Sequence, residues 1–118
     1  MSIESRYLFC AAMDVEPSRE ALFNEVYDRE HVPLIATVPG VIATARFKRE
    51  ELTMIIGGEH KTIVIEGEPR YNALYELESP GVLTSDAWAK AVDQGRWPGE
   101  VRPFTKNRRH VLYRRIVS

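Results

Sequence analysis

The sequence contains more apolar strand segments than its helical segments can cover, and this imbalance restricts the possible folds more than any other feature. Segment 6–13 is apolar at both of its alternating sets of positions, and segments 41–48 and 71–78 are apolar at every second position. A strand that is apolar on both faces is buried on both faces. Only two segments, 17–31 and 84–95, have the apolar spacing of an amphipathic helix. Two helices cover one face of a sheet, so the other face needs a different cover.

The order of the predicted elements indicates an α+β fold with one antiparallel sheet. A last strand is predicted over 109–117, so the order is strand, helix, strand, strand, helix, strand. Residues 49–70 interrupt this order, because two β-branched runs flank Gly57-Gly58 as in a hairpin with a glycine-containing loop. The order is that of the ferredoxin-like βαββαβ fold, with 49–70 as an inserted hairpin arm. A length of 118 residues predicts one domain over 1–118.

Local signals predict where the two helices begin and end. Pro33 disfavours the helical conformation for the residue before it, so the first helix is expected to end or kink near His31. Thr84 or Ser85 is expected to cap the start of the second helix, and Gly95 is expected to end it.

A second copy of the chain is the simplest cover for the sheet face that the helices leave open. A contiguous apolar face of roughly several hundred Å2 is rare on a monomer. Two sheets packed face to face about a two-fold axis bury such a face. We therefore predict a homodimer in which the two sheets form a dimeric α/β barrel. The residues expected on this face are Leu8, Cys10, Ala12, Ile42, Leu74, Leu112 and Ile116.

Charge argues against several classes of partner. The chain has 16 Lys and Arg against 17 Asp and Glu, so its net charge is −1 and a general affinity for nucleic acid or for an anionic membrane is not expected. Basic residues do gather between 102 and 115, where they balance acids elsewhere, attract an anionic substrate or form a nucleic-acid patch, but without the aromatic residues of a stacking platform. Asp28 and Glu30 are expected to face solvent or to pair locally with Arg29.

Cysteine, histidine and the N-terminus predict no metal centre and no export. Cys10 is the only cysteine, which excludes an internal disulfide and a zinc-thiolate cluster. The histidines, His31, His60 and His110, share no metal-ligand spacing, so we expect neither a metal nor a cofactor. The N-terminus lacks the pattern of a secretion signal, and no apolar run approaches the ~20 residues that span a bilayer. We therefore expect a soluble cytoplasmic protein.

The most informative motif in the chain covers residues 23–41 and the strand that follows. It consists of Phe23-Asn24, Tyr27-Asp28, Glu30-His31, Pro33, Val38-Pro39-Gly40 and Ala45-Arg46-Phe47. This pattern resembles the EthD-like branch of the dimeric α/β-barrel proteins. The resemblance implies a homodimer whose sheets enclose a cavity. Relatives across that superfamily include ring-cleavage pathway isomerases, cofactor-independent monooxygenases, aromatic polyketide cyclases and haem-handling proteins, so the resemblance narrows the architecture more than the chemistry.

Tyr27 and His31 are the first candidate catalytic residues. They are four residues apart and therefore share one side of a helix, where a phenol and an imidazole can bind a ligand or move a proton. An unperturbed imidazole titrates near ~6.5, which suits general acid–base catalysis. The structural alternative is that His31 bonds a backbone carbonyl freed by Pro33, while Tyr27 is a core residue.

Arg46 is the third candidate catalytic residue, because it lies toward the end of a strand that should be buried on both sides. If Arg46 and Glu76 share the inward face they form a buried ion pair, which avoids the cost of burying either charge alone. Together with Asn72, they either orient a polar ligand between apolar walls or fix the register of the dimer. Thr44 and Trp88 complete the predicted ligand pocket, with packing as the alternative role for Trp88.

Three functions remain open, and the sequence does not decide whether the protein is an enzyme. The first is a cofactor-independent enzyme that isomerises, cyclises, dehydrates or oxygenates an aromatic or largely apolar compound with a polar group. Tyr27 and His31 would then handle protons, and Arg46 would stabilise negative charge. The second is a ligand-binding or chaperone-like homodimer, and the third is a structural dimer whose interior is filled by side chains.

Two further points bear on this choice. A haem-handling role with His31 as the ligand follows only by analogy with the superfamily. A cavity of ~300 Å3 or more beside His31 would argue against the structural dimer.

Overall fold

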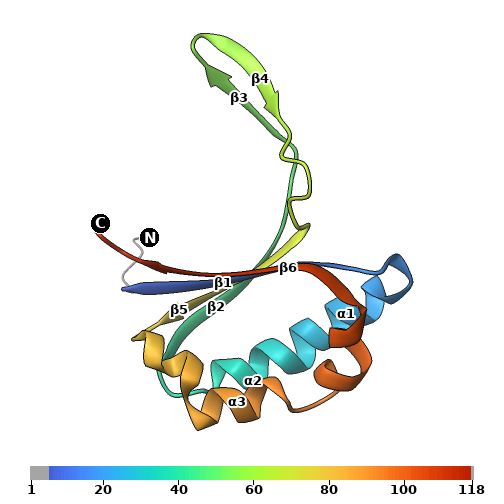
Figure 1. The fold of residues 1–118 in the computed structure, drawn as a ribbon, viewed down its shortest axis with the longest axis vertical. Helices are drawn as coiled ribbons and strands as arrows, with labels where there is room; N and C mark the ends of the chain where they lie inside the picture. The colour runs from blue at the N-terminus through green and yellow to red at the C-terminus, as the bar shows by residue number, and fades with distance from the viewer. Residues whose placement is uncertain (1–5, 118) are drawn as a thin grey trace.

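A four-stranded antiparallel sheet is the centre of the fold (Figure 1), which we describe from a computed structural model covering residues 6–117. The strands lie in the order β2-β5-β1-β6. Their bounds are Tyr7–Val15 for β1, Val41–Lys48 for β2, Tyr71–Leu77 for β5 and Thr105–Arg114 for β6. Helical segments connect β1 to β2 and β5 to β6, which gives the ferredoxin-like arrangement. The predicted fold class is therefore confirmed.

The helical segments cover one face of the sheet only (Figure 1). Those between β1 and β2 are η1 (Pro17–Arg19), α1 (Glu20–Val26), η2 (Tyr27–His31) and α2 (Val32–Ala36). Those between β5 and β6 are η3 (Pro80–Thr84), α3 (Asp86–Val92), η4 (Trp97–Val101) and η5 (Arg102–Phe104). The hydrophobic core lies between these segments and the sheet. None of the helices within residues 6–117 has both the length and the apolar character needed to cross a membrane.

The first helix does not end near His31 but widens there. Between α1 and α2 the turn η2 is a π-helix, in which the N–H of Val32 donates to the carbonyl of Tyr27. Pro33 explains this turn, because it has no N–H and its ring clashes with the carbonyl four residues earlier in an ordinary α-helix. Both ends of the turn, Tyr27 and His31, are buried. Such wide turns are often found at functional sites.

The second predicted helix begins as expected. The hydroxyl of Ser85 accepts a hydrogen bond from the N–H of Trp88 at 3.1 Å and so caps α3. Gly95 follows this helix with φ +71°, a conformation that glycine adopts without strain. The strand β6, by contrast, begins at Thr105, four residues before the predicted start.

The cross-strand register decides which residues lie on the uncovered side of the sheet, called here the open face. In the centre of the sheet, Cys10 pairs with Leu74 on one side and with Val111 on the other, so these three residues share that face. The full set is Leu8, Cys10 and Ala12 of β1, Ala43, Ala45 and Phe47 of β2, Asn72, Leu74 and Glu76 of β5, and Arg109, Val111 and Tyr113 of β6. The predicted member Ile42 lies at the shift in register between Val41 and Ala43 and has no paired residue in β5. This face is therefore largely apolar, as the sequence predicts.

One predicted member of the open face lies on the other side. Leu112 pairs with Phe9, whose ring stacks on Tyr75 and meets the edge of Trp88 in the helical layer. The prediction for Leu112 is wrong because a shift of one residue in a strand moves every side chain to the opposite face. Ile116 lies beyond the end of β6.

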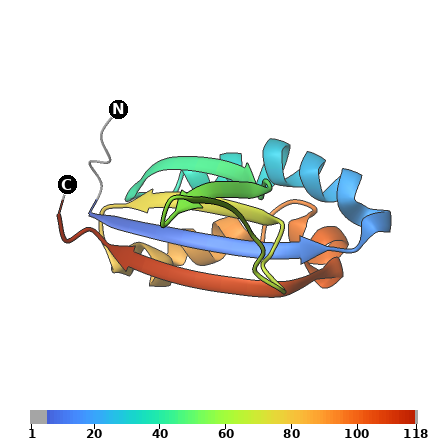
Figure 2. The same cartoon turned by 90° about the horizontal axis from the view of Figure 1, so that it is seen from above.

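The predicted hairpin arm rises from the open face. Strands β3 (Leu52–Ile56) and β4 (Glu59–Ile63) pair only with each other, as a separate two-stranded sheet. Figure 1 shows the arm leaving the main sheet on the side away from the helices, and Figure 2, which looks down on that side, shows it above the sheet. Leu52, Met54 and Ile56 share one face of the arm and are 43–48% exposed. The arm thus carries large apolar side chains that are about half exposed.

Candidate functional site

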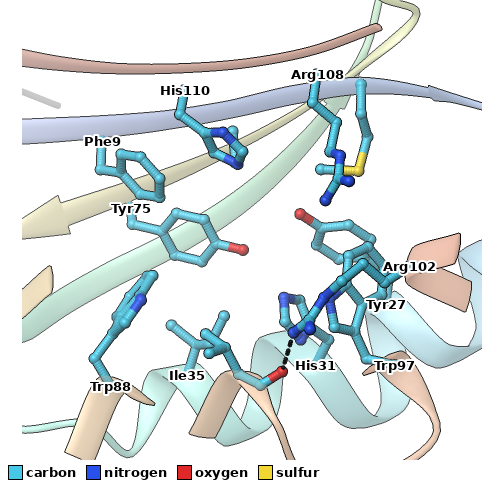
Figure 3. A pocket seen from close by; sticks show the side chains of 13 residues that line it. Phe9, Tyr27, His31, Ile35, Tyr75, Trp88, Trp97, Arg102, Arg108 and His110 are labelled. Carbon is cyan, nitrogen blue, oxygen red and sulfur yellow. Dashed lines mark hydrogen bonds between the residues drawn. The ribbon is translucent and has the colours of Figure 1, made fainter. Parts of the chain in front are cut away.

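A cavity of about 210 Å3 lies between the sheet and the helical layer (Figure 3). Aromatic side chains form much of its wall. Phe9 stacks on Tyr75 with ring centroids 5.8 Å apart, and Trp88 meets both rings edge-on. On the other side, His31 and Trp97 lie next to Tyr27. The cavity therefore suits a ligand with a flat, apolar body.

His31 is the buried polar group of this cavity, with 5% of its surface exposed. The widened turn η2 brings its ring against the indole of Trp97, at 4.3 Å between centroids, and beside Tyr27 at 5.1 Å. Its Nδ1 atom is buried and has no hydrogen-bond partner within residues 6–117. Burial is the main reason that the pKa of His31 is lowered to about 4, and the charges of Arg102 and Arg46 lower it further. His31 is therefore neutral at pH 7.

Two tyrosine hydroxyls accompany His31. Tyr27 is 2% exposed and Tyr75 is 1% exposed, and Figure 3 shows the Tyr75 hydroxyl pointing into the cavity. Burial raises the pKa of Tyr75 well above the usual range, and the neighbouring Tyr27 raises it further. Burial also raises the pKa of Tyr27, although Tyr75 and Arg46 oppose that shift. Both phenols therefore remain protonated near neutral pH and can donate hydrogen bonds to an oxygen of a ligand.

Two arginines and a second histidine complete the polar part of the cavity. Arg102 is held by hydrogen bonds from its Nη2 atom to the carbonyl of Val92 at 2.9 Å and to Oδ1 of Asp93 at 3.0 Å. Arg108 and His110 reach the cavity from β6 (Figure 3). Burial lowers the pKa of His110, and the charge of Arg108 lowers it further. The positive charge at the cavity thus comes from the two guanidinium groups.

Arg46 lies outside the cavity, behind Tyr27. It pairs with Ala73 in the register of β2 and β5, so its side chain is on the helix side of the sheet. Its Nη1 atom donates to Oδ1 of Asp28 at 2.6 Å and its Nη2 atom to Oδ1 of Asn24 at 2.9 Å. Its Cζ atom lies 4.3 Å from the centre of the Tyr27 ring. Arg46 therefore connects the first helix to the sheet edge and packs against a ring that lines the cavity.

The predicted ion pair between Arg46 and Glu76 does not form. Glu76 pairs with Leu8 in β1 and belongs to the open face, whereas Arg46 is on the helix side. Asp28 faces solvent as expected, with its side chain 61% exposed, but the local pairing of Asp28 and Glu30 with Arg29 does not occur. Asp28 binds Arg46, and Glu30 binds Arg96 at 2.5 Å, so neither pairs with its sequence neighbour.

The remaining predicted pocket residues divide between the two faces of the sheet. Trp88 lines the cavity together with Tyr27 and His31. Thr44 lies on the helix side opposite Tyr75 but outside the cavity wall. Asn72, like Glu76, is on the open face, and its Oδ1 atom is buried without a partner among the described residues.

Four polar residues of the cavity were missed by the sequence analysis, namely Tyr75, Arg102, Arg108 and His110. Tyr75 was taken as part of an apolar alternating set, although a buried tyrosine usually directs its hydroxyl to a polar partner. Arg102 and Arg108 were seen only as members of a basic run. Since the run alternates between faces along β6, its charge pattern alone could not show that Arg108 points inward. Within residues 6–117, no group of three or more His, Cys, Asp or Glu residues is placed to hold a metal ion.

Solved structures provide the informative comparison. No protein-family model matches the sequence, and the search of curated proteins finds no significant relative. A mutant of MhuD, described with two manganese protoporphyrin IX molecules bound per active site, matches with a TM-score of 0.62 and 12% identity, over 95% of this chain and 96% of that one. MhuD from Mycobacterium tuberculosis, described as a haem degrader with two haems bound in its active site, matches with a TM-score of 0.57 and 16% identity, over 95% and 97%.

An EthD (ethyl tert-butyl ether D) family protein from Bacillus halodurans C-125 also matches, with a TM-score of 0.56 and 13% identity, over 93% of this chain and 99% of that one. The chain has the fold of these proteins. The resemblance predicted from the motif at residues 23–47 thus agrees with the structure, because an EthD family protein is among the structural neighbours. At these identities the likeness concerns the fold, so the chemistry has to be argued from the cavity.

Proposed function

We propose that this protein is a cofactor-independent enzyme that moves a proton on a small, largely apolar compound bound in the cavity beside His31. The observation that carries this proposal is the buried ring of His31, which lines the cavity and whose Nδ1 atom has no partner among the described residues. Buried polar groups in proteins are nearly always hydrogen-bonded. A polar ligand bound beside His31 would complete the hydrogen bonding of this ring.

The protonation states of the cavity support a division of roles. Neutral His31 accepts a proton from a carbon next to a carbonyl group of the substrate, and the electron pair of the broken C–H bond moves onto the carbonyl oxygen. The protonated hydroxyls of Tyr75 and Tyr27 donate hydrogen bonds to that oxygen as it becomes negative. This negative charge in turn favours the imidazolium form of His31, which offsets its low basicity in the empty cavity. In a substrate whose enolate is conjugated with a C=C double bond, return of the proton to the far carbon of that double bond completes an isomerisation.

Among the reaction types predicted from the sequence, isomerisation, cyclisation and dehydration share this first step. Arg46 does not reach the cavity, so we propose that it acts as a positioning residue. It holds the Tyr27 ring from behind through its contacts with Asp28 and Asn24. Its charge also lowers the pKa of His31, which helps to keep the imidazole neutral.

We also propose that the functional form is a homodimer joined through the open face. Phe47 and Tyr113 on this face are 55% and 56% exposed, and Val111 is 39% exposed, although all three are large apolar or aromatic residues. A second sheet packed on them would remove this surface from water. It would also enclose Asn72, whose Oδ1 atom has no partner among the described residues. The predicted ligand-pocket residues Asn72 and Glu76 would then lie between the two sheets.

The arm is consistent with such a partner. It rises on the side of the open face and lies above the sheet, so a second sheet placed there would meet the arm (Figures 1 and 2). A two-stranded hairpin is marginally stable by itself. Contacts of Leu52, Met54 and Ile56 with the second copy would cover the apolar face of the arm.

The haem-handling alternative does not fit the cavity. A volume of about 210 Å3 is below the ~300–1,000 Å3 of pockets that hold drug-sized ligands, and a porphyrin needs the upper part of that range. The same small volume means that size alone does not exclude a structural dimer, and the unpartnered Nδ1 atom is what favours a ligand.

The experiment that tests the proposed function first identifies compounds that co-purify with the native protein, by mass spectrometry. Each compound with a C–H bond next to a carbonyl group is then incubated in D2O with the protein, and deuterium incorporation is followed by NMR. We expect wild-type protein to catalyse the exchange and His31→Gln to lose it while still binding the compound. Exchange that is unaffected by His31→Gln contradicts the proposal, and binding without any exchange by the wild type favours the non-catalytic homodimer.

A further inference from the structure

We propose that the cavity beside His31 is an anion site whose ligand is a compact carboxylate with a single aromatic or similar ring, bound through Arg108 with support from Arg102. This inference rests on the proposed function, because it concerns the same cavity, and it names the class of compound that enters.

The charge of the cavity wall is the first argument. Two guanidinium groups, those of Arg102 and Arg108, lie on the wall, and no Asp or Glu does so among residues 6–117. The pKa of both histidines of the wall, His31 and His110, is lowered, which disfavours their charged forms. An anion that enters the cavity therefore meets positive charge at short range and no carboxylate that repels it.

Arg108 is the group that is free to bind this anion. Its neighbour Arg109 forms an ion pair with Glu68 at 2.9 Å on the opposite side of the strand. Within the described part of the chain Arg108 has no carboxylate partner. Its charge acts there on His110, whose pKa it lowers. Figure 3 shows its side chain reaching from β6 over the cavity. A guanidinium group in this position is available for a two-bonded contact with a carboxylate.

An irregularity in β6 directs Arg108 toward the cavity. The register between β1 and β6 shifts between Ala12 and Asp14, and Asn107 has a left-handed backbone with φ +52°. The side chain of Asn107 fixes this distortion by donating to Oδ2 of Asp14 at 3.0 Å and to the carbonyl of Gly67 at 2.7 Å. Bulges of this kind re-aim side chains and are common next to active sites. The amide of Asn107, the carboxylate of Asp14 and the carbonyl of Gly67 thus hold the unusual backbone beside Arg108 in place.

Arg102 serves as a fixed second cation. Its Nη2 atom is used by Val92 and Asp93, so its guanidinium group is held in place at the cavity wall. The side chain of Asp93 is 66% exposed and outside the cavity, so water screens its negative charge. Arg102 therefore contributes positive potential, whereas Arg108 supplies the direct contact.

The volume and the wall set the size of the ligand. The cavity measures about 210 Å3, which is less than drug-sized ligands require, so it admits one ring with a short polar substituent. The rings of Phe9, Tyr75 and Trp88 provide flat apolar contacts for that ring. With its carboxylate at Arg108, the ligand extends toward the His31 ring across the cavity.

Isothermal titration calorimetry with benzoate and benzamide tests the inference, because the two compounds have nearly the same shape and differ in charge. We expect wild-type protein to bind benzoate about tenfold or more tightly than benzamide. Arg108→Gln is expected to abolish this preference and to leave the affinity for benzamide within about twofold. Arg108→Lys should restore part of the preference. Lys106→Gln removes a positive charge two residues earlier on the same strand, outside the cavity, and is the matched control.

Three outcomes overturn the inference. They are equal affinity for benzoate and benzamide in the wild type, an unchanged preference in folded Arg108→Gln, and no benzoate binding at millimolar concentration. The far-ultraviolet circular dichroism of each variant shows whether it is folded. The result is distinct from the test of catalysis: a benzoate preference that depends on Arg108, without His31-dependent exchange on any ligand, upholds the anion site and contradicts the proposed enzyme.

Discussion

The imidazole of His31 stacks on the indole of Trp97, with 4.3 Å between the ring centroids and 21° between the ring planes. This contact removes one face of the imidazole from water. It therefore accounts for part of the burial that lowers the pKa of His31, and it fixes the ring in the orientation that leaves Nδ1 unpartnered. The stability, the protonation and the proposed chemistry of the site all depend on this pair.

The stability of the protein is predicted to depend on pH through His31. Its pKa is about 4 in the folded state and ~6.5 in the unfolded chain, so the unfolded chain binds a proton first as the pH falls. The contribution of neutral His31 is complete above pH 6.5 and is lost progressively between pH 6.5 and 4. Urea unfolding of wild type and His31→Gln at fixed protein concentration should show that the wild type loses roughly 3 kcal/mol more over this interval. Equal losses in the two proteins would contradict the lowered pKa.

Removal of the indole is predicted to raise the pKa of His31. In Trp97→Leu the imidazole regains water on one face, so its pKa should move from about 4 toward 6.5. Trp88→Leu is the matched control, because Trp88 lines the same cavity and packs against Phe9 and Tyr75 instead. NMR titration of the His31 ring protons measures both. An identical His31 pKa in wild type and Trp97→Leu would show that the stacking does not cause the shift.

The contacts of Arg46 predict that its contribution to the free energy of unfolding is coupled to Asp28 and not to Glu76. Arg46→Met should lower the free energy of unfolding by about 1–3 kcal/mol, because it removes hydrogen bonds to Asp28 and Asn24 from a side chain that is 16% exposed. A double-mutant cycle should give a coupling of about 0.5–1 kcal/mol between Arg46 and Asp28, whose side chain is largely exposed, and about zero between Arg46 and Glu76. Coupling to Glu76 of similar size would show that the two share a face after all.

The open face is predicted to hold the homodimer together. Phe47→Lys places a charge on this face and should shift the protein to monomers in sedimentation equilibrium at micromolar concentration. Leu112→Lys is the control, because Leu112 is similarly exposed, at 41%, but lies on the helix side. A wild-type protein that sediments as a monomer, or a Phe47→Lys variant that remains dimeric, would remove the support for this interface.

Removal of the arm is predicted to weaken the dimer without unfolding the domain. The N–H of Arg49 donates to the carbonyl of Arg70 at 2.7 Å, so the two ends of the arm are adjacent and a short glycine-serine turn can replace residues 50–69. The circular dichroism spectrum of the shortened chain should show the main sheet and helices intact. Its dimer dissociation constant should rise about tenfold or more, because Leu52, Met54 and Ile56 no longer contact a second copy. A dimer dissociation constant equal to that of the full chain would show that the arm does not contribute to the dimer.

Periodicity was sufficient to predict the strands, the two helical segments and the hairpin, because each has its own apolar spacing. Periodicity was insufficient to predict on which face of the sheet the side chains of the edge strands β2 and β6 lie. The sequence leaves open whether Arg46 and Glu76 share a face and predicts Leu112 on the wrong one, because the parity of one strand relative to the next depends on bulges that leave no clear pattern in the sequence. The pair Tyr27 and His31 was found because both residues are on one helix. Arg108 was not, because its inward direction depends on the backbone of Asn107.

The wide turn η2 also determines how α1 is rotated relative to α2, and so the direction in which the side chains of α1 point. An α-helix advances by about 100° per residue, so the one extra residue that the wide turn accommodates sets the angle between α1 and α2. If Pro33→Ala allowed the turn to relax to ordinary helical pitch, α1 would rotate by that angle and carry Tyr27 away from Trp97. The ring of Pro33, which lies outside the cavity, thus fixes the orientation of the Tyr27 phenol relative to the His31 imidazole inside it.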